Sequence, residues 1–201
     1  MKGKILKLAI GLFVFIFAIS MTSVITEAES AKFFSYTQKK QAKDRWCWAA
    51  SAENSVRWEM SITRDQYDAV KKIKGTPIIE PYPNVGGTLA DIKNAAEYIS
   101  ENTESYSKTA LSQYRGVKSF LFLRDEVKNG DVTILVAGYY DSEGNRYGGH
   151  AVTCTGYSTS GDISQIYIYD PLDGSTSLVK YGYFSNGFGS RNYDGTVWNA
   201  E

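Results

Sequence analysis

Near residue 130 the hydrophobic pattern of this chain changes from a helical period to the alternation of strands. Between Cys47 and about Asn129, apolar residues recur at the spacing of an α-helix. After that point, short runs rich in β-branched and aromatic residues are separated by turn residues, which is typical of strands. Helices followed by strands indicate an α+β fold, with an N-terminal helical lobe (about 41–130) packed on a C-terminal antiparallel β-sheet lobe (about 131–201).

Three helices are expected in the first half. One begins near Cys47, where an apolar residue recurs at every fourth position: Trp48, Ala52, Val56 and Met60. The second follows Thr88, which is a good N-cap with Asp91 three residues later, an imperfect capping box. The third runs from Phe120 to Val127 and is stopped by Asn129-Gly130.

Four strands are expected in the second half, each bounded by turn residues. They are Val132–Tyr140, Ala151–Tyr157, Ile163–Tyr169 and Leu178–Tyr183. The turn between the second and third strands is expected to centre on Ser160.

The N-terminus has the pattern of a secretory signal peptide, residues 1–28. Three basic residues, Lys2, Lys4 and Lys7, precede a nearly unbroken apolar run from Leu8 to Ile19, and Ala28 ends a suitable cleavage site. The expected mature protein, 29–201, is a single domain that is released outside the cell. The alternative is an uncleaved anchor, because Leu8 to Ile25 almost reaches the roughly 20 residues that span a bilayer.

The charge balance argues against a nucleic acid or membrane partner. The whole chain has 22 basic and 22 acidic residues. Removal of residues 1–28 takes away three lysines and one glutamate, which leaves 19 against 21 and a net charge of −2. A nearly neutral protein without a basic run has no electrostatic footprint for nucleic acid or for an anionic membrane surface.

His150 is the only histidine of the chain, so every histidine-dependent mechanism must use it. Zinc sites built on two or three histidines are thereby excluded, and we expect neither a metal nor another cofactor. The ordinary interpretation of a lone histidine is a surface or turn residue whose hydrogen bonds are satisfied. Here it follows Gly148-Gly149 at the start of an expected strand, where glycines would let a substrate backbone approach the imidazole.

Asp170 is the expected partner of this histidine. If the turn centres on Ser160, antiparallel pairing places His150 directly opposite Asp170, about 5 Å away at Cβ. A carboxylate there can accept the imidazole N–H and favour the imidazolium. Asp170-Pro171 is also a common turn pair, and the two roles are compatible.

Cys47 is the candidate nucleophile. It lies at the start of the first expected helix, where the helix dipole and unpaired N–H groups stabilise a thiolate. Gln41, six residues earlier, could supply a side-chain amide that forms an oxyanion hole with the backbone N–H of Cys47. The main alternative is a disulfide with Cys154, since two cysteines of an exported protein often pair. Cys154 lies four residues beyond His150, about 13 Å away along a strand, which argues against that disulfide.

Three segments together resemble papain-like cysteine proteases. Gln41-Ala-Lys-Asp-Arg-Trp-Cys-Trp-Ala-Ala-Ser51 is similar to the nucleophile segment of that family, Gly148 to Val152 to its histidine segment, and Ile168 to Leu172 to the segment of its third catalytic residue. The combination resembles compact bacterial enzymes, including staphopain-like peptidases and the leader-processing peptidases of bacteriocin exporters. The resemblance implies a papain-like fold with the active site between the two lobes, and it covers the chain from Gln41 onwards.

The departures from the family pattern limit what is carried over. Papain has a Gly-Ser-Cys-Trp run and an asparagine as third residue, whereas here Arg45-Trp46 precede the cysteine and the third residue is an aspartate. Bacteriocin-exporter peptidases are fused to a transporter in the cytosol, so their function is not transferred to this chain. Residues 29–40 are too few for an inhibitory prodomain, so a separate inhibitor protein remains an open partner.

The resemblance and the residues together predict a secreted cysteine peptidase with Cys47 as nucleophile, His150 as base, Asp170 as its orienting residue and Gln41 in the oxyanion hole. Its expected partner is a protein or peptide substrate, without stable membrane association once the signal is removed. Two alternatives stay open. One is a thiol-dependent acyltransferase or amidase acting on a non-protein amide, and the other is a non-catalytic binding protein on the same scaffold.

Overall fold

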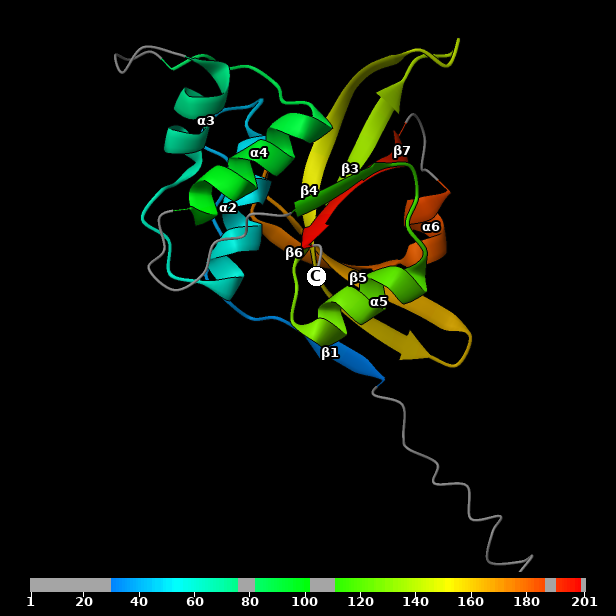
Figure 1. Cartoon of the computed structure of the whole chain (residues 1–201). Coiled ribbons are helices and arrows are strands. Elements are labelled where there is room, and N and C mark those ends of the chain that lie inside the picture. The colour runs from blue at the N-terminus through cyan, green and yellow to red at the C-terminus, as the bar shows by residue number, and fades with distance from the viewer. Residues whose placement is uncertain (1–29, 76–81, 102–110, 187–190, 200–201) are drawn as a thin grey trace, which may run out of the picture. The chain divides into compact units, whose positions relative to one another are not determined.

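Figure 1 shows the computed structural model of the chain, which describes residues 30–75, 82–101, 111–186 and 191–199. The chain divides into two units, Met1–Ser30 and Ala31–Glu201, and all the elements described below lie in the second unit. The predicted signal peptide, residues 1–28, lies outside the described residues. Within the described ranges, none of the helices has the length and apolar character needed to cross a membrane.

The described residues form five helices and seven strands, which confirms the α+β class. In chain order the elements are β1 (Ala31–Phe33), α2 (Cys47–Glu59), α3 (Gln66–Lys74), α4 (Leu89–Ser100), β2 (Leu111–Arg115), α5 (Phe120–Asn129), β3 (Thr133–Tyr140), β4 (Arg146–Ser160), β5 (Ile163–Asp170), β6 (Ser175–Lys180), α6 (Tyr181–Ser185) and β7 (Arg191–Asn199).

One antiparallel sheet holds all seven strands, in the order β2-β7-β3-β4-β5-β6, with β1 paired to β4 beside this path. β1 and β2 come before residue 131, so the sheet uses segments from both halves of the chain. β3 and β5 lie where the sequence predicts them, and β4 contains the expected strand Ala151–Tyr157 but runs from Arg146 to Ser160. The expected strand Leu178–Tyr183 is wrong in part, because pairing of β6 with β5 ends at Lys180 and the chain then turns into α6, which buries Phe184.

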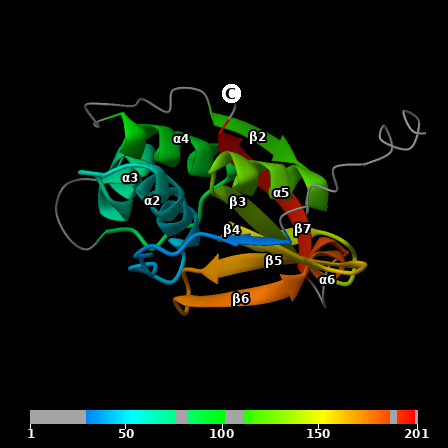
Figure 2. The same ribbon diagram turned by 90° about the horizontal axis from the view of Figure 1, so that it is seen from below.

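The sheet separates two hydrophobic clusters. Side chains of α2, α3 and α4 pack with Ile134 and Val136 of β3 in the first cluster. Side chains of α5 and α6 pack with Leu135 of β3 in the second cluster, so successive residues of one strand serve opposite faces. Figures 1 and 2 show α2, α3 and α4 gathered together, and Figure 1 shows α5 apart from them.

The helix starts explain where the helices lie. Asp65 caps α3, Ser119 caps α5, and at α4 the capping box between Thr88 and Asp91 is complete. These side chains accept hydrogen bonds from first-turn N–H groups, which have no partner within the helix. α2 differs from these three helices, because its N-cap residue, Trp46, contributes no capping hydrogen bond from its side chain.

Candidate active site

Cys47 is the first residue of α2, so it lies at the positive end of the helix dipole. Because no side chain caps this helix, the N–H groups of Cys47 and Trp48 remain available to an anion at the sulfur, whereas that of Ala49 donates to the carbonyl of Trp46. The side chain is half-buried and its thiol is free. This is the environment in which a thiolate is stabilised.

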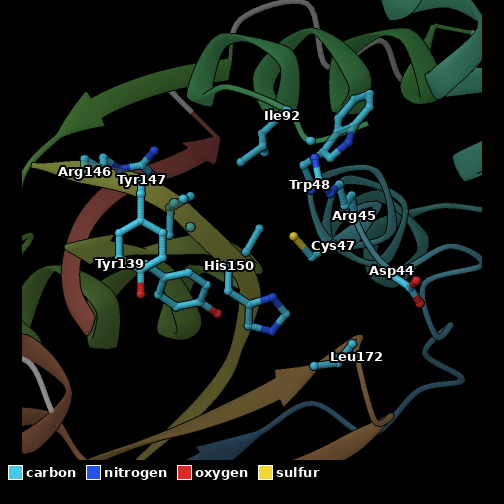
Figure 3. A pocket seen from close by; sticks show the side chains of 16 residues that line it. Asp44, Arg45, Cys47, Trp48, Ile92, Tyr139, Arg146, Tyr147, His150 and Leu172 are labelled. Carbon is cyan, nitrogen blue, oxygen red and sulfur yellow. The ribbon is translucent and has the colours of Figure 1, made fainter. Parts of the chain in front are cut away.

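His150 and Asp170 form a close pair. The imidazole Nε2 lies 2.6 Å from Asp170 Oδ1, and the same oxygen accepts a hydrogen bond from the backbone N–H of Leu172 at 2.8 Å. The His150 side chain is only 12 % exposed. With Nε2 bonded to the carboxylate, Nδ1 is the ring nitrogen left for Cys47, whose sulfur faces the imidazole in Figure 3.

The pairing that brings Asp170 to His150 differs from the predicted one. The turn is Gly161-Asp162, so Ser160 pairs with Ile163, and a bulge near Thr155 shifts the register before Thr153 pairs with Tyr169. The expectation that His150 stands directly opposite Asp170 is therefore wrong. The two residues are diagonal neighbours, and diagonal Cβ atoms about 7–8 Å apart are still within reach of long side chains.

The charged partners of His150 decide its protonation. Burial disfavours the imidazolium and lowers the pKa, but the hydrogen bonds and charges of Asp170 and Cys47 act in the opposite direction and win. The net result raises the pKa of His150 from 6.5 to about 9. The histidine is therefore charged at neutral pH and can stabilise a thiolate at Cys47.

Cys47 and His150 face a cavity of about 480 Å³, and Asp170 holds the imidazole from behind. Cys47, Trp48 and Gly87 line it from the helical side, while His150, the residues before it on β4, and Tyr139 line it from the sheet side (Figure 3). The volume lies within the range of sites for small ligands or a few residues of a peptide. A cysteine sulfur beside a histidine at the wall of such a cavity is an arrangement suited to nucleophilic catalysis.

Comparison with known proteins agrees with this chemistry. Residues 32–199 match the Peptidase_C39-like family, which is most of the chain. The chain belongs to the Peptidase_C39-like family. This Peptidase_C39-like protein is thus a cysteine protease, as its sequence predicts. None of the curated proteins matches its sequence.

Solved structures similar to this Peptidase_C39-like protein have papain-like folds. One comes from a study of limited antibody cross-reactivity between the mite allergens Blo t 1 and Der p 1, with 12 % identity over 90 % of this chain and 74 % of that chain, at a TM-score of 0.54. Digestive procathepsin L2 proteinase from the larval midgut of Tenebrio molitor is 12 % identical over 90 % of this chain and 71 % of that chain, with a TM-score of 0.52. Digestive procathepsin L 3 of the same tissue is 14 % identical over 89 % of this chain and 72 % of that chain, with a TM-score of 0.54. The papain-like fold is thereby confirmed.

Cys47 and Cys154 are both free, so the two cysteines of this Peptidase_C39-like protein do not form the alternative disulfide. Cys154 is fully buried in the second cluster, and its sulfur lies 3.6 Å from the carbonyl oxygen of Gly156. Burial raises the pKa of the Cys154 thiol to about 12, so this cysteine is protonated and unreactive at ordinary pH.

Gln41 lies in the loop before α2, as predicted, but its side chain is already hydrogen-bonded. The amide Nε2 donates to the carbonyl oxygens of Lys43 and Asp44 at 2.9 and 2.8 Å. Its Oε1 is buried and has no partner among the described residues. The backbone N–H of Gln41 donates to Pro171, which ties the nucleophile loop to the turn after Asp170. The oxyanion role of Gln41 stays a prediction.

A set of polar contacts that sequence reasoning missed holds the loop before Cys47. The side chain of Asn54 on α2 bonds both the N–H and the carbonyl of Lys39, at 2.7 and 2.9 Å. Gln66 on α3 donates to the carbonyl of Lys40 and accepts from the N–H of Ala42, at 2.9 and 2.8 Å. These bonds join segments far apart in the chain, so no local pattern in the sequence reveals them.

The two tryptophans beside Cys47 have different roles, which the sequence alone did not distinguish. Trp46 is fully buried and donates its indole N–H to Pro83, whereas Trp48 reaches the cavity and donates to Val85. The guanidinium of Arg146 occupies the space that a side chain at position 149 would fill. This space is therefore not open to a substrate.

Proposed function

We propose that this protein is an exported peptidase that cleaves peptide bonds through a Cys47–His150–Asp170 triad and an acyl-enzyme intermediate. The observation that carries the proposal is the 2.6 Å contact between His150 Nε2 and Asp170 Oδ1, which orients the other ring nitrogen towards Cys47. A carboxylate that fixes the imidazole in this way also stabilises the imidazolium during the reaction.

In this mechanism the Cys47 thiolate attacks the carbonyl carbon of the scissile bond and forms a tetrahedral oxyanion. The imidazolium of His150 gives its proton to the leaving amine, and the acyl-enzyme remains. The now neutral imidazole takes a proton from water, whose oxygen attacks the thioester and releases the second product. Asp170 stays ionised throughout and keeps the ring in place.

The oxyanion is stabilised by backbone and side-chain donors. Cys47 is the first residue of α2, so its N–H has no partner within the helix and is one donor. Gln41 is the second donor in this proposal. Because both hydrogens of its Nε2 go to Lys43 and Asp44 in the resting structure, one of those two bonds must exchange for the oxyanion.

The enzyme is proposed to act outside the cell after cleavage behind Ala28. The support is the sequence of residues 1–28, with its basic start and apolar run. N-terminal sequencing of the protein from culture medium should find Glu29, or a residue within a few positions of it, at the start. A product that keeps Met1 and sediments with membranes would favour the uncleaved anchor.

The test of the peptidase function is the hydrolysis of fluorescently labelled casein by the purified secreted protein. We expect digestion that an epoxysuccinyl thiol-protease inhibitor stops, and a loss of at least about a thousandfold in Cys47→Ala. Cys154→Ala is the matched control, since it removes the other cysteine and should keep activity. Equal digestion by Cys47→Ala would refute the triad. New amide products in place of hydrolysed peptides would indicate an acyltransferase.

A further inference from the structure

Arg146 lies at the end of the cavity far from Asp44, beside Tyr147 (Figure 3). Its Nε donates to Asp194 Oδ2 on β7 at 2.7 Å. The same carboxylate oxygen accepts the hydroxyl of Tyr140 at 2.9 Å. The Asp194 side chain is 15 % exposed, so a largely buried carboxylate fixes the guanidinium of a residue at the cavity wall.

Two glycines make the room for this ion pair. Gly138 on β3 and Gly149 on β4 are paired in the sheet, so any side chains at these positions would point to the same face. A Cβ at Gly149 would lie 2.5 Å from an NH2 nitrogen of Arg146, and a Cβ at Gly138 would lie 2.3 Å from Asp194 Oδ2. The paired glycines therefore form a slot in the sheet, and the ion pair fills it.

The slot opens beside an apolar part of the cavity. Ile92, Val136 and Ala151 line that part and are almost fully buried. A substrate side chain that enters it meets apolar atoms along its stem and the guanidinium at its end. Nε of Arg146 donates to Asp194, and the guanidinium also interacts with the hydroxyl of Tyr140. Its two terminal NH2 groups carry further N–H donors that a substrate carboxylate can accept.

We propose that Arg146 is a specificity-determining residue that selects substrates with an aspartate or glutamate side chain in this part of the cavity. The inference rests on the proposed peptidase function. Asp194 already compensates one positive charge, and Arg146 is 38 % exposed, so a substrate carboxylate gains a partly screened, charge-assisted hydrogen bond. We expect a preference for Glu over Gln of about tenfold in kcat/KM.

The first measurement locates the position that Arg146 contacts. The purified secreted protein is incubated with a peptide library made by tryptic digestion of a bacterial proteome, and mass spectrometry identifies the cleavage sites. We expect Asp and Glu to be enriched at one position near the scissile bond. Two synthetic peptides that differ only by Glu or Gln at that position then give the ratio of kcat/KM.

The variants separate recognition from a structural role of the ion pair. Arg146→Gln should bring the Glu/Gln ratio of kcat/KM from about ten to about one. Arg146→Lys should give an intermediate ratio, because lysine keeps the positive charge but lacks the two parallel N–H donors of the guanidinium. Arg124→Gln is the matched control, since it breaks an exposed Arg–Asp pair on α5, away from the cavity, and should keep the wild-type ratio.

The outcomes distinguish this inference from the proposed function. Cleavage by the wild type without an acidic preference would overturn the role of Arg146 and leave the peptidase intact. An unchanged ratio in Arg146→Gln would do the same. The comparison of the Glu and Gln peptides on the wild type decides the matter even if Arg146→Gln fails to fold. The absence of any cleavage by the wild type would overturn the proposed function and this inference with it.

Discussion

The protonation of His150 gives the sharpest test of the triad, because the chain has no other histidine. We expect the wild-type imidazole to titrate with a pKa of about 9, well above the ordinary 6.5. The perturbation is Asp170→Ala, which removes the carboxylate 2.6 Å from Nε2. Asp170→Asn is the second variant for comparison, since its amide oxygen still accepts the imidazole N–H but carries no charge.

The magnitude follows from the balance of burial against the two partners. The rise from 6.5 to about 9 corresponds to about 3 kcal/mol in favour of the imidazolium. An opposite charge at hydrogen-bond distance typically moves a pKa by about one to three. We therefore expect the pKa of His150 to fall to roughly 6–8 in Asp170→Ala and to lie between this value and that of the wild type in Asp170→Asn.

The assay is a proton–carbon NMR titration of the single imidazole, on protein without a histidine tag. Asp173→Asn is the matched control, because it neutralises an acid on the same turn whose side chain bonds the N–H of Ser175 instead of His150. A wild-type pKa at or below 6.5 would refute the reasoning, since burial would then outweigh Asp170 and Cys47. So would an unchanged pKa in Asp170→Ala.

The same titration sets the pH dependence of activity and of folding. In the proposed mechanism the imidazolium is the acid that protonates the leaving amine, so casein hydrolysis should decline as pH rises through about 9, and at lower pH in Asp170→Ala. The folded-state pKa of His150 lies above its unfolded value. Its contribution to stability is therefore complete below about 6.5 and lost as pH rises through about 9.

Three further predictions follow from the geometry. At pH 6, iodoacetamide should alkylate Cys47 much faster than buried Cys154, as mapped by mass spectrometry; no labelling before reduction would indicate a disulfide. Gln41→Ala should lower kcat about a hundredfold or more with little change in KM, and an unchanged kcat would exclude it from the oxyanion hole. Gly156→Ala should lower Tm by several degrees, because its Cβ would lie 2.5 Å from a carbonyl oxygen of β1. Gly182→Ala, with open space around it, should not, and equal Tm values would contradict this account.

Local chemistry made α2, α4, α5 and the central strands predictable, whereas α3 and α6 were not predicted. Thr88 and Asp91 set the start of α4, and Gly130, at φ 104°, ends α5 as the sequence predicts. β2 and β7 were missed, because β2 is only five residues long and the run of β7 is interrupted by Asp194-Gly195. β2 is specified by its pairing with β7, and β7 by its pairing with β2 and β3, which are long-range properties.

Residue types were enough to predict two members of the candidate site. The contacts that depend on how the strands pair could not be predicted. The only histidine and a cysteine at a helix start identified His150 and Cys47 from the sequence alone. Asp170 was chosen through a register that the structure does not have, and the contact is still made because diagonal neighbours can reach one another. The occupant of the space at Gly149 could not be foreseen, since Arg146 folds back only when Asp194 of β7 is in place.

The helix that begins at Cys47, α2, lacks a local stabilising contact that its surroundings replace. An N-cap side chain is worth about 1 kcal/mol, and α2 lacks the one that α3, α4 and α5 have. The positions on either side of Cys47 supply anchors instead, because the indoles of Trp46 and Trp48 donate to the carbonyls of Pro83 and Val85. These bonds hold the helix start without occupying the backbone N–H groups of Cys47 and Trp48, which the proposed mechanism uses for the thiolate and the oxyanion. A capping side chain at position 46 would accept from the N–H of Trp48 or Ala49, so an uncapped start leaves the N–H of Trp48 for the proposed thiolate.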